Sequence, residues 1–217
     1  MSEQDYQPGQ VIEELPLFPL PAAVLFPGML LPLHVFELRY RAMTEHVLAG
    51  TKQMAVVLLT SGPSDDAGQP AIAQVAGMGE VVQHHALSDG RFNIVLRGMA
   101  RVQLQELPFT GPFRRARAVV LPSHEGNVGD GDLVSLVYSA TRFAAQLRSR
   151  DSQFELQLPD VHDPAATVDA CAHQLIIESD ERQQILETLH VGNRVRRCVE
   201  VLAVQAALLQ AHAGMLS

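Results

Sequence analysis

The chain has 217 residues, 47% of them hydrophobic, and a formal net charge of −8. A chain of this length buries about 70% of its unfolded surface, which is enough for one or two hydrophobic cores. Its longest apolar runs are far shorter than the roughly 20 residues of a membrane-spanning helix, and its N-terminus lacks the basic and apolar regions of a signal peptide. Cys171 and Cys198 have no Cys-x-x-Cys spacing, which is typical of free thiols in a reducing compartment. The composition therefore excludes a membrane protein and predicts a cytoplasmic one.

Residues 15–33 form a dense apolar segment that prolines interrupt. Because proline fixes φ and removes a backbone donor, we expect short, broken edge strands here and no continuous central strand. The prolines that carry this expectation are Pro16, Pro19, Pro21 and Pro27. So many large side chains near bends cannot all reach one small core. Some of those at residues 17–31 are therefore expected to line an exposed groove.

A helical period begins after Pro32. Apolar residues recur four, three and four positions apart, which is one face of a helix. We expect Gly50 to end this helix. The residues on the predicted buried face are Phe36, Tyr40, Met43 and Val47.

Strand patterns fill the rest of the first half. Residues 54–59 are apolar and rich in β-branched side chains, as in a strand buried on both faces. Asp89-Gly90 supplies the positive φ of a tight hairpin turn between strands at 79–85 and 91–97. Gly98 is expected at a bulge before a strand at 100–106, and the last strand is 115–121. Five or six strands with one inserted helix predict a small, partly closed barrel.

The chain is expected to divide at the Gly/Asn/Asp cluster of residues 126–131. We predict an α+β protein with a β-rich domain at 1–122, a linker at 123–131 and a helical bundle at 132–217. Asp163-Pro164 is a helix start, and Ser179 is expected to cap a short helix around 184–189. Residues 1–122 carry nine basic and eleven acidic residues, so their net charge is −2. Residues 123–217 carry seven basic and thirteen acidic residues, so their net charge is −6.

Several of these motifs resemble the N-terminal, substrate-binding domain of Lon proteases, and they follow that family's order. The motifs are Leu15–Leu20, Val24–Gly28, Leu31–His34, Phe36-Glu37, Arg39–Met43, Leu87–Arg91, Gly98 with Arg101, and Gln184–Glu187. The resemblance implies a PUA-like β pseudobarrel followed by a C-terminal helical bundle. Leu38 stands where the family usually has proline, which allows the helix to begin earlier. The residues expected to mark the fold are Pro27, Gly28, Glu37, Arg39 and Tyr40.

A Lon protease also needs an ATPase with a P-loop lysine and a Ser-Lys catalytic dyad. Lys52 is the only lysine, and neither a glycine-rich loop before it nor a Ser or Thr directly after it completes a P-loop. It stands at the start of an apolar strand, where a solvated lysine is the ordinary interpretation. The resemblance therefore implies a stand-alone binding domain that is not an enzyme and has no cofactor.

Other side-chain clusters are weak candidates for chemistry. His84 and His85 are adjacent and point to opposite faces of a strand, which disfavours a zinc site. Cys171 and His173 lie on different faces of one helix, which disfavours a thiol nucleophile. A hydrolase would depend on a residue such as His34 or Glu37, but the sequence shows no set of catalytic residues around either.

RNA is the main alternative partner, because PUA-like folds also bind RNA. The basic patch that such binding would use consists of Arg114, Arg115 and Arg117. Phosphate binding needs several convergent cations, and the net charge of this half makes nucleic acid a poor match. We expect these arginines to be solvated or to pair with the acidic bundle.

The predicted function is therefore recognition of unfolded or partner proteins, alone or as an adaptor for a protease. The residues predicted to contact a peptide are Met29, Leu30, Phe109 and Phe113. The alternative for all four is ordinary core. A small-ligand-binding protein is the remaining alternative, and it requires an enclosed pocket that a sequence cannot show.

Overall fold

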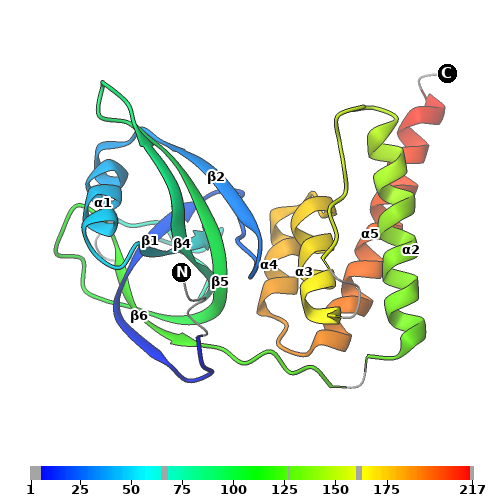
Figure 1. Cartoon of the computed structure of the whole chain (residues 1–217), viewed down its shortest axis with the longest axis horizontal. Helices are drawn as coiled ribbons and strands as arrows, with labels where there is room; N and C mark the ends of the chain where they lie inside the picture. Colours follow the sequence, from blue (N-terminus) through cyan, green and yellow to red (C-terminus); the bar gives the residue numbers. More distant parts are fainter. Residues whose placement is uncertain (1–5, 65–67, 127, 160–162, 216–217) are drawn as a thin grey trace. The chain divides into compact units, whose positions relative to one another are not determined.

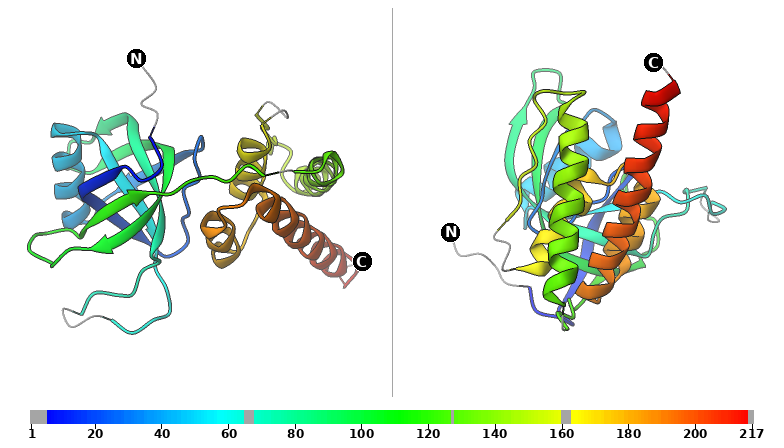
Figure 2. Two further views of the ribbon diagram at one scale, coloured as in Figure 1. Left: turned by 90° about the horizontal axis from the view of Figure 1, so that it is seen from below. Right: turned by 90° about the vertical axis from the view of Figure 1, so that its right-hand side faces the viewer.

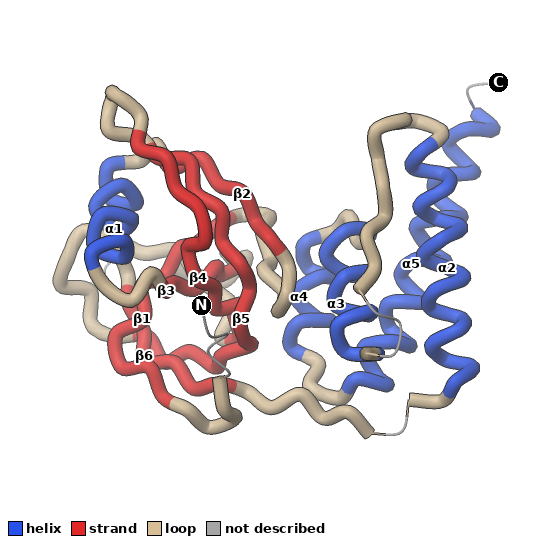
Figure 3. The backbone as a smooth tube through the Cα atoms, viewed as in Figure 1, coloured by secondary structure: helices blue, strands red, loops and turns tan. Residues whose placement is uncertain are grey.

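The computed structural model describes residues 6–64, 68–126, 128–159 and 163–215. The chain divides into two compact units, Met1–Pro122 and Ser123–Ser217. All strands lie in the first unit, together with helix α1, and the other helices lie in the second (Figure 3). Among the described residues, no helix is long and apolar enough to cross a membrane.

Strand pairing closes a ring in the first unit (Figure 1). The strands are β1 (Val11–Leu20), β2 (Leu30–Val35), β3 (Gln53–Leu58), β4 (Val75–Ala86), β5 (Phe92–Glu106) and β6 (Arg115–Val120). Neighbours pair in the order β1-β3-β4-β5-β6 and back to β1, and only the β1–β3 pair is parallel. β2 pairs with the first half of β5 and forms an edge outside the ring. The Asp89-Gly90 turn, with Gly90 at φ +80°, joins β4 to β5 as predicted.

β3 is buried on both faces, also as predicted, because it separates two cores. Ala55 and Val57 face one apolar cluster, made largely of small residues from the strands of the ring. Met54 and Val56 face the other cluster, which α1 (Leu38–Ala49) covers. The left view in Figure 2 shows α1 against the outside of the strands.

β1 corrects the expectation of broken strands, because it runs unbroken through Pro16 and Pro19. Its first half pairs with β6 and its second half with β3, so each half has one open edge. The N–H of Leu17 donates to the carbonyl oxygen of Arg114 at 2.9 Å. Successive backbone nitrogens point to opposite edges, so Pro16 faces the edge where β3 has not yet joined, and Pro19 faces the edge where β6 has ended. Each proline lies where the ladder requires no donor.

Glycines in β4 and β5 allow the segment between β1 and β2 to pack into the core. Leu25 and Phe26 are fully buried in that segment. A Cβ at Gly77 would lie 1.8 Å from the carbonyl oxygen of Leu25, and a Cβ at Gly98 would lie 2.0 Å from that of Phe26. β4 and β5 therefore need glycine at these positions, so that the loop backbone can cross them. Gly98 also lies at a register shift between the two strands, which confirms the predicted bulge.

Helix α1 begins later than its apolar spacing predicted. Glu37 is its N-cap in an extended conformation, and Gly50 ends it as expected. Tyr40, Met43 and Val47 are buried as predicted. Phe36 precedes the N-cap and is 61% exposed, so its assignment to the buried helix face was wrong. It continues the strand alternation of β2.

The described part of the second unit contains four helices. They are α2 (Asp130–Arg148), α3 (Pro164–Leu175), α4 (Ser179–Glu187) and α5 (Val191–Met215). Asp163 caps α3 through the N–H of Ala166 at 3.0 Å, with Pro164 at the first helical position, as predicted. Glu178, not Ser179, is the N-cap of α4, and no side-chain hydrogen bond closes it. The right view in Figure 2 shows α2 beside α5.

A buried ion pair lies within this helical unit. Arg194 has no exposed side-chain surface, and its Nε lies 3.3 Å from Oδ1 of Asp169, which is 4% exposed. The guanidinium also donates to the carbonyl oxygens of Thr188 and Leu189 and to the hydroxyl of Ser123. These partners offset the cost of taking the charge out of water.

Candidate functional site

An exposed row of side chains runs along the edge strand β2. Alternate side chains of β2 pack against the core, and the intervening ones point outward. The ring of Phe36 stacks on that of His34, with centroids 6.2 Å apart, so the outward row continues past the end of the strand. We call this set the β2 row; its members are Leu30, Pro32, His34 and Phe36.

The β2 row includes two large apolar side chains that are exposed to solvent. Leu30 is 53% exposed and Phe36 is 61% exposed, and Leu38 at the start of α1 is 77% exposed. A shallow hollow of about 450 Å³ lies beside Pro32, over β4 and β5. Neighbouring exposed apolar side chains of this kind commonly mark an interaction surface.

The free edge of β2 is poorly suited to pairing with another strand. The N–H of Gly98 donates to the carbonyl oxygen of Met29 at 2.8 Å, so this pair is hydrogen-bonded. By alternation, the backbone groups of Leu30, Pro32 and His34 point to the open edge. Proline has no N–H, so the middle of that edge lacks a donor. The row therefore offers its side chains for recognition more readily than its backbone.

A polar chain of contacts orients His34. Its Nδ1 lies 2.7 Å from Oδ1 of Asn93, and its Nε2 lies 3.3 Å from Nη1 of Arg91. Arg91 in turn donates to Asp89 at 2.6 Å, and its backbone N–H and guanidinium hold the pKa of that carboxyl below its usual value. These groups are exposed and include no nucleophile, so they position an imidazole and do not form a catalytic triad.

The four residues predicted to contact a peptide do not form one surface. Leu30 is exposed in the β2 row and Met29 is half-buried beside it. Phe109, at 46% exposure, lies in the loop between β5 and β6. Phe113 is only 6% exposed and packs on the ring of His46, which corrects its expected surface position. Phe36 was not among the residues predicted to contact a peptide, although the alternation of positions 30, 32, 34 and 36 was a signal for it.

Three of the fold-marker residues lie at the corner between β2 and α1, and the other two lie between β1 and β2. Glu37 accepts from Arg39 at 3.0 Å, and the Arg39 guanidinium lies 4.5 Å from the centre of the Tyr40 ring. Burial raises the pKa of Tyr40, whose ring contacts that of Phe18. Gly28, next to Pro27, has φ +78° and donates to the carbonyl oxygen of Gly98.

The basic patch at the start of β6 is neutralised within the first unit. Arg114 forms a two-pronged ion pair with Glu106, at 2.6 Å for each contact. Arg115 lies 3.6 Å from Glu14, and Arg117 lies 3.3 Å from Glu13. Within the described residues, the carboxylate partners of these arginines come from β5 and β1. This arrangement leaves little free positive charge for a phosphate backbone.

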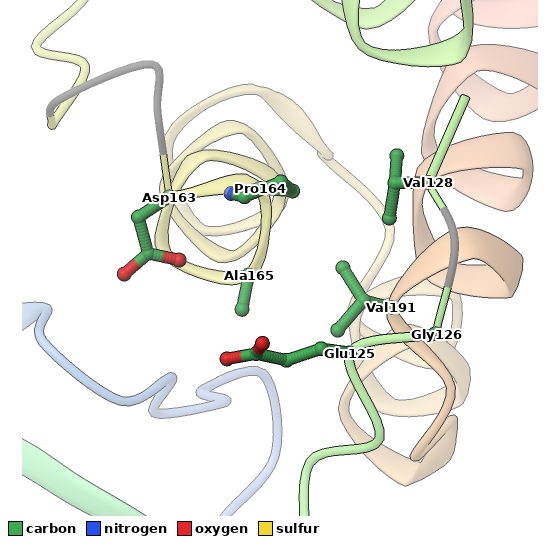
Figure 4. A pocket seen from close by; sticks show the side chains of 7 residues that line it. All are labelled: Glu125, Gly126, Val128, Asp163, Pro164, Ala165 and Val191. Atoms are coloured by element: carbon green, nitrogen blue, oxygen red, sulfur yellow. The ribbon is translucent and has the colours of Figure 1, made fainter. Parts of the chain in front are cut away.

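Other sites in the described part of the chain suggest no reaction. A hollow of about 270 Å³ in the second unit lies among Glu125, Asp163, Val128 and Val191 (Figure 4). Asp163 is already engaged as a helix cap, and only apolar side chains and Glu125 complete the lining. No three His, Cys, Asp or Glu side chains within the described ranges are grouped to hold a metal ion.

Comparison with known proteins agrees with this fold. The substrate-binding domain of ATP-dependent protease La (LON) matches residues 14–204. The chain therefore belongs to the LON substrate-binding domain family. The Lon protease of Roseiflexus castenholzii is 28% identical over 211 residues, which cover 93% of this chain and 25% of that protein. The Lon protease of Azorhizobium caulinodans is 25% identical and is covered to 24%. The chain thus spans about a quarter of the length of these relatives.

Solved structures show the same architecture. The N-terminal domain of Mycobacterium avium complex Lon protease has a TM-score of 0.64 at 18% identity, with 88% of this chain and 98% of that chain covered. A Lon N-terminal domain protein from Xanthomonas campestris has the same TM-score at 19% identity, with 87% and 98% covered. At these identities the likeness bears on the fold, a mixed α+β architecture.

Proposed function

We propose that this chain is a non-catalytic recognition domain that binds apolar segments of unfolded or partner proteins through the β2 row. The observation that carries the proposal is the exposure of Leu30 on an edge strand and of Phe36 just after it, in a member of a substrate-binding family. The domain acts either alone or as an adaptor that passes the bound protein to a protease, and the proposal covers both cases. The location proposed is the cytoplasm.

The physical basis is burial of the row on binding. Each large apolar side chain that leaves water contributes about 1.5–3 kcal/mol, and the row offers two that are more than half exposed. Ordering an unfolded partner costs part of this gain, so the affinity is expected in the range of micromolar to millimolar. Weak binding of this kind suits capture and release of many sequences.

The closed ring of strands supports the further inference that the first unit is a PUA-like pseudobarrel. RNA binding, which such folds also perform, is disfavoured because Arg114, Arg115 and Arg117 all have carboxylate partners. A small ligand is disfavoured at the β2 row, where the hollow is shallow and open.

The test compares binding of unfolded β-casein by the native chain and by the variant Leu30→Ser/Phe36→Ser. We expect the variant to weaken binding at least tenfold, because two exposed apolar side chains are removed without touching the core. Phe109→Ser is the matched control, since Phe109 is also exposed but lies outside the row. Equal binding by all three proteins would reject the β2 row as the site. Loss with Phe109→Ser alone would move the site to the β5–β6 loop.

A further inference from the structure

The second unit carries an apolar groove with an acidic rim, separate from the β2 row. It has a volume of about 500 Å³ and lies between α5 and the turn that joins α3 to α4. Ile177, Val204 and Leu208 line it and are 58%, 61% and 56% exposed. Val201 and Leu209 continue the apolar floor along α5. We call this site the α5 groove.

Hydrogen bonds of the Gln205 side chain hold the two walls of the α5 groove together. Gln205 of α5 accepts from the N–H of Ile177 at 2.8 Å and donates to the carbonyl oxygen of Leu175 at 3.0 Å. Gln205 is only 9% exposed, so these hydrogen bonds are largely shielded from water. The turn is thereby fixed with Ile177 in the lining. The groove is a preformed feature, and a ligand does not have to order it.

The rim of the groove is negatively charged. Glu178, Glu181 and Glu200 line it, with Arg197 as the single basic lining residue. Arg197 contacts Glu181 at 2.6 Å and Glu200 at 3.8 Å, so one positive charge is shared between two carboxylates. The lining therefore carries a surplus of two negative charges, within a half of the chain whose net charge is −6.

We infer that the α5 groove docks an amphipathic, basic helix of a partner protein. Val201, Val204 and Leu208 follow the three- and four-residue spacing of one helix face, which is the pattern onto which a second helix packs. Lysine or arginine beside the partner's apolar stripe would meet the rim carboxylates. A second copy of this chain fits less well, because a symmetric dimer would bring both sets of glutamates together. The inference is independent of the proposed function of the β2 row.

The test uses a synthetic amphipathic peptide of leucine and lysine, about five helical turns long, and a leucine–glutamate peptide of the same pattern. Fluorescence anisotropy measures binding of both peptides to the whole chain. We expect the Leu/Lys peptide to bind and the Leu/Glu peptide to bind at least tenfold more weakly. Leu208→Ser is expected to weaken Leu/Lys binding about tenfold, and Val204→Ser gives a second measurement at an exposed position.

Charge and position have separate controls. Glu178→Gln/Glu200→Gln is expected to weaken binding about fivefold at low salt, whereas Glu45→Gln/Glu80→Gln, in the first unit, removes the same charge without effect. Val134→Ser removes an exposed apolar side chain of α2 and should leave binding unchanged. Equal binding of the two peptides, or no loss with both Leu208→Ser and Val204→Ser, would overturn the inference. Dimerisation of the native chain that Leu208→Ser abolishes would also overturn it, because the occupant would then be a second copy.

Discussion

Removing Asp169 should strongly destabilise the helical unit, because it leaves the charge of Arg194 buried without its carboxylate partner. Arg194 is fully buried, and its Nε lies 3.3 Å from Oδ1 of Asp169, which is buried as well. Breaking a buried pair by removing one partner costs about 3–5 kcal/mol, because the remaining charge stays out of water. At about 1.4 kcal/mol per factor of ten, Asp169→Ala should raise the population of the open unit by a hundredfold or more.

The two cysteines provide an assay that is specific to this unit. Cys171 and Cys198 are fully buried, both lie in the second unit, and the sequence has no other cysteine. The rate at which Cys171 reacts with a thiol reagent therefore reports opening of the helical unit alone. The double variant Asp169→Leu/Arg194→Met removes both charges and should recover most of the lost protection. A change of less than tenfold with Asp169→Ala, or no recovery in the double variant, would refute this reasoning.

The remaining predictions concern the ring of strands, alkaline pH and the arginine on β6. Gly77→Ala should lower the free energy of unfolding by at least about 2 kcal/mol in urea titrations, because its Cβ would overlap the backbone of Leu25; Gly131→Ala, with nothing within 4 Å, is the control. Burial raises the pKa of the Cys171 thiol to about 12 from an ordinary value of 9.0, so the folded state holds this proton more tightly than the unfolded state does. The stability of the second unit should therefore be complete below pH 9.0 and should fall as the pH rises toward 12. Cys171→Ala should make this fall in stability less steep. Arg114→Ala, which breaks the ion pair with Glu106, should lower the stability of the first unit in urea titrations. The same variant should leave the retention of RNA in filter-binding assays unchanged.

Local signals in the sequence predicted the elements whose causes are local. Asp89-Gly90 determines a turn by its own backbone preference, and Asp163-Pro164 starts a helix through its own cap and ring. The strand at 53–58 was recognisable because burial on both faces removes polar residues altogether. Each of these features depends on residues that are neighbours in the chain.

Features that depend on distant partners could not be predicted. β1 tolerates Pro16 and Pro19 because its partner changes from β6 to β3 along its length, which no local pattern records. Phe113 is buried because it packs into the apolar cluster that α1 covers, whose other members are far away in the chain. The α5 groove likewise requires Gln205 to hold a turn formed thirty residues earlier.

Hydrogen exchange of the whole chain with and without unfolded β-casein, in low and high salt, tests whether the β2 row recognises unfolded protein. We expect protection of residues 29–38 that survives high salt, since apolar contacts are not screened. The Leu30→Ser/Phe36→Ser variant should lose that protection while its other peptides exchange as before. Absence of protection at residues 29–38, or protection that disappears in high salt, would contradict recognition through the β2 row.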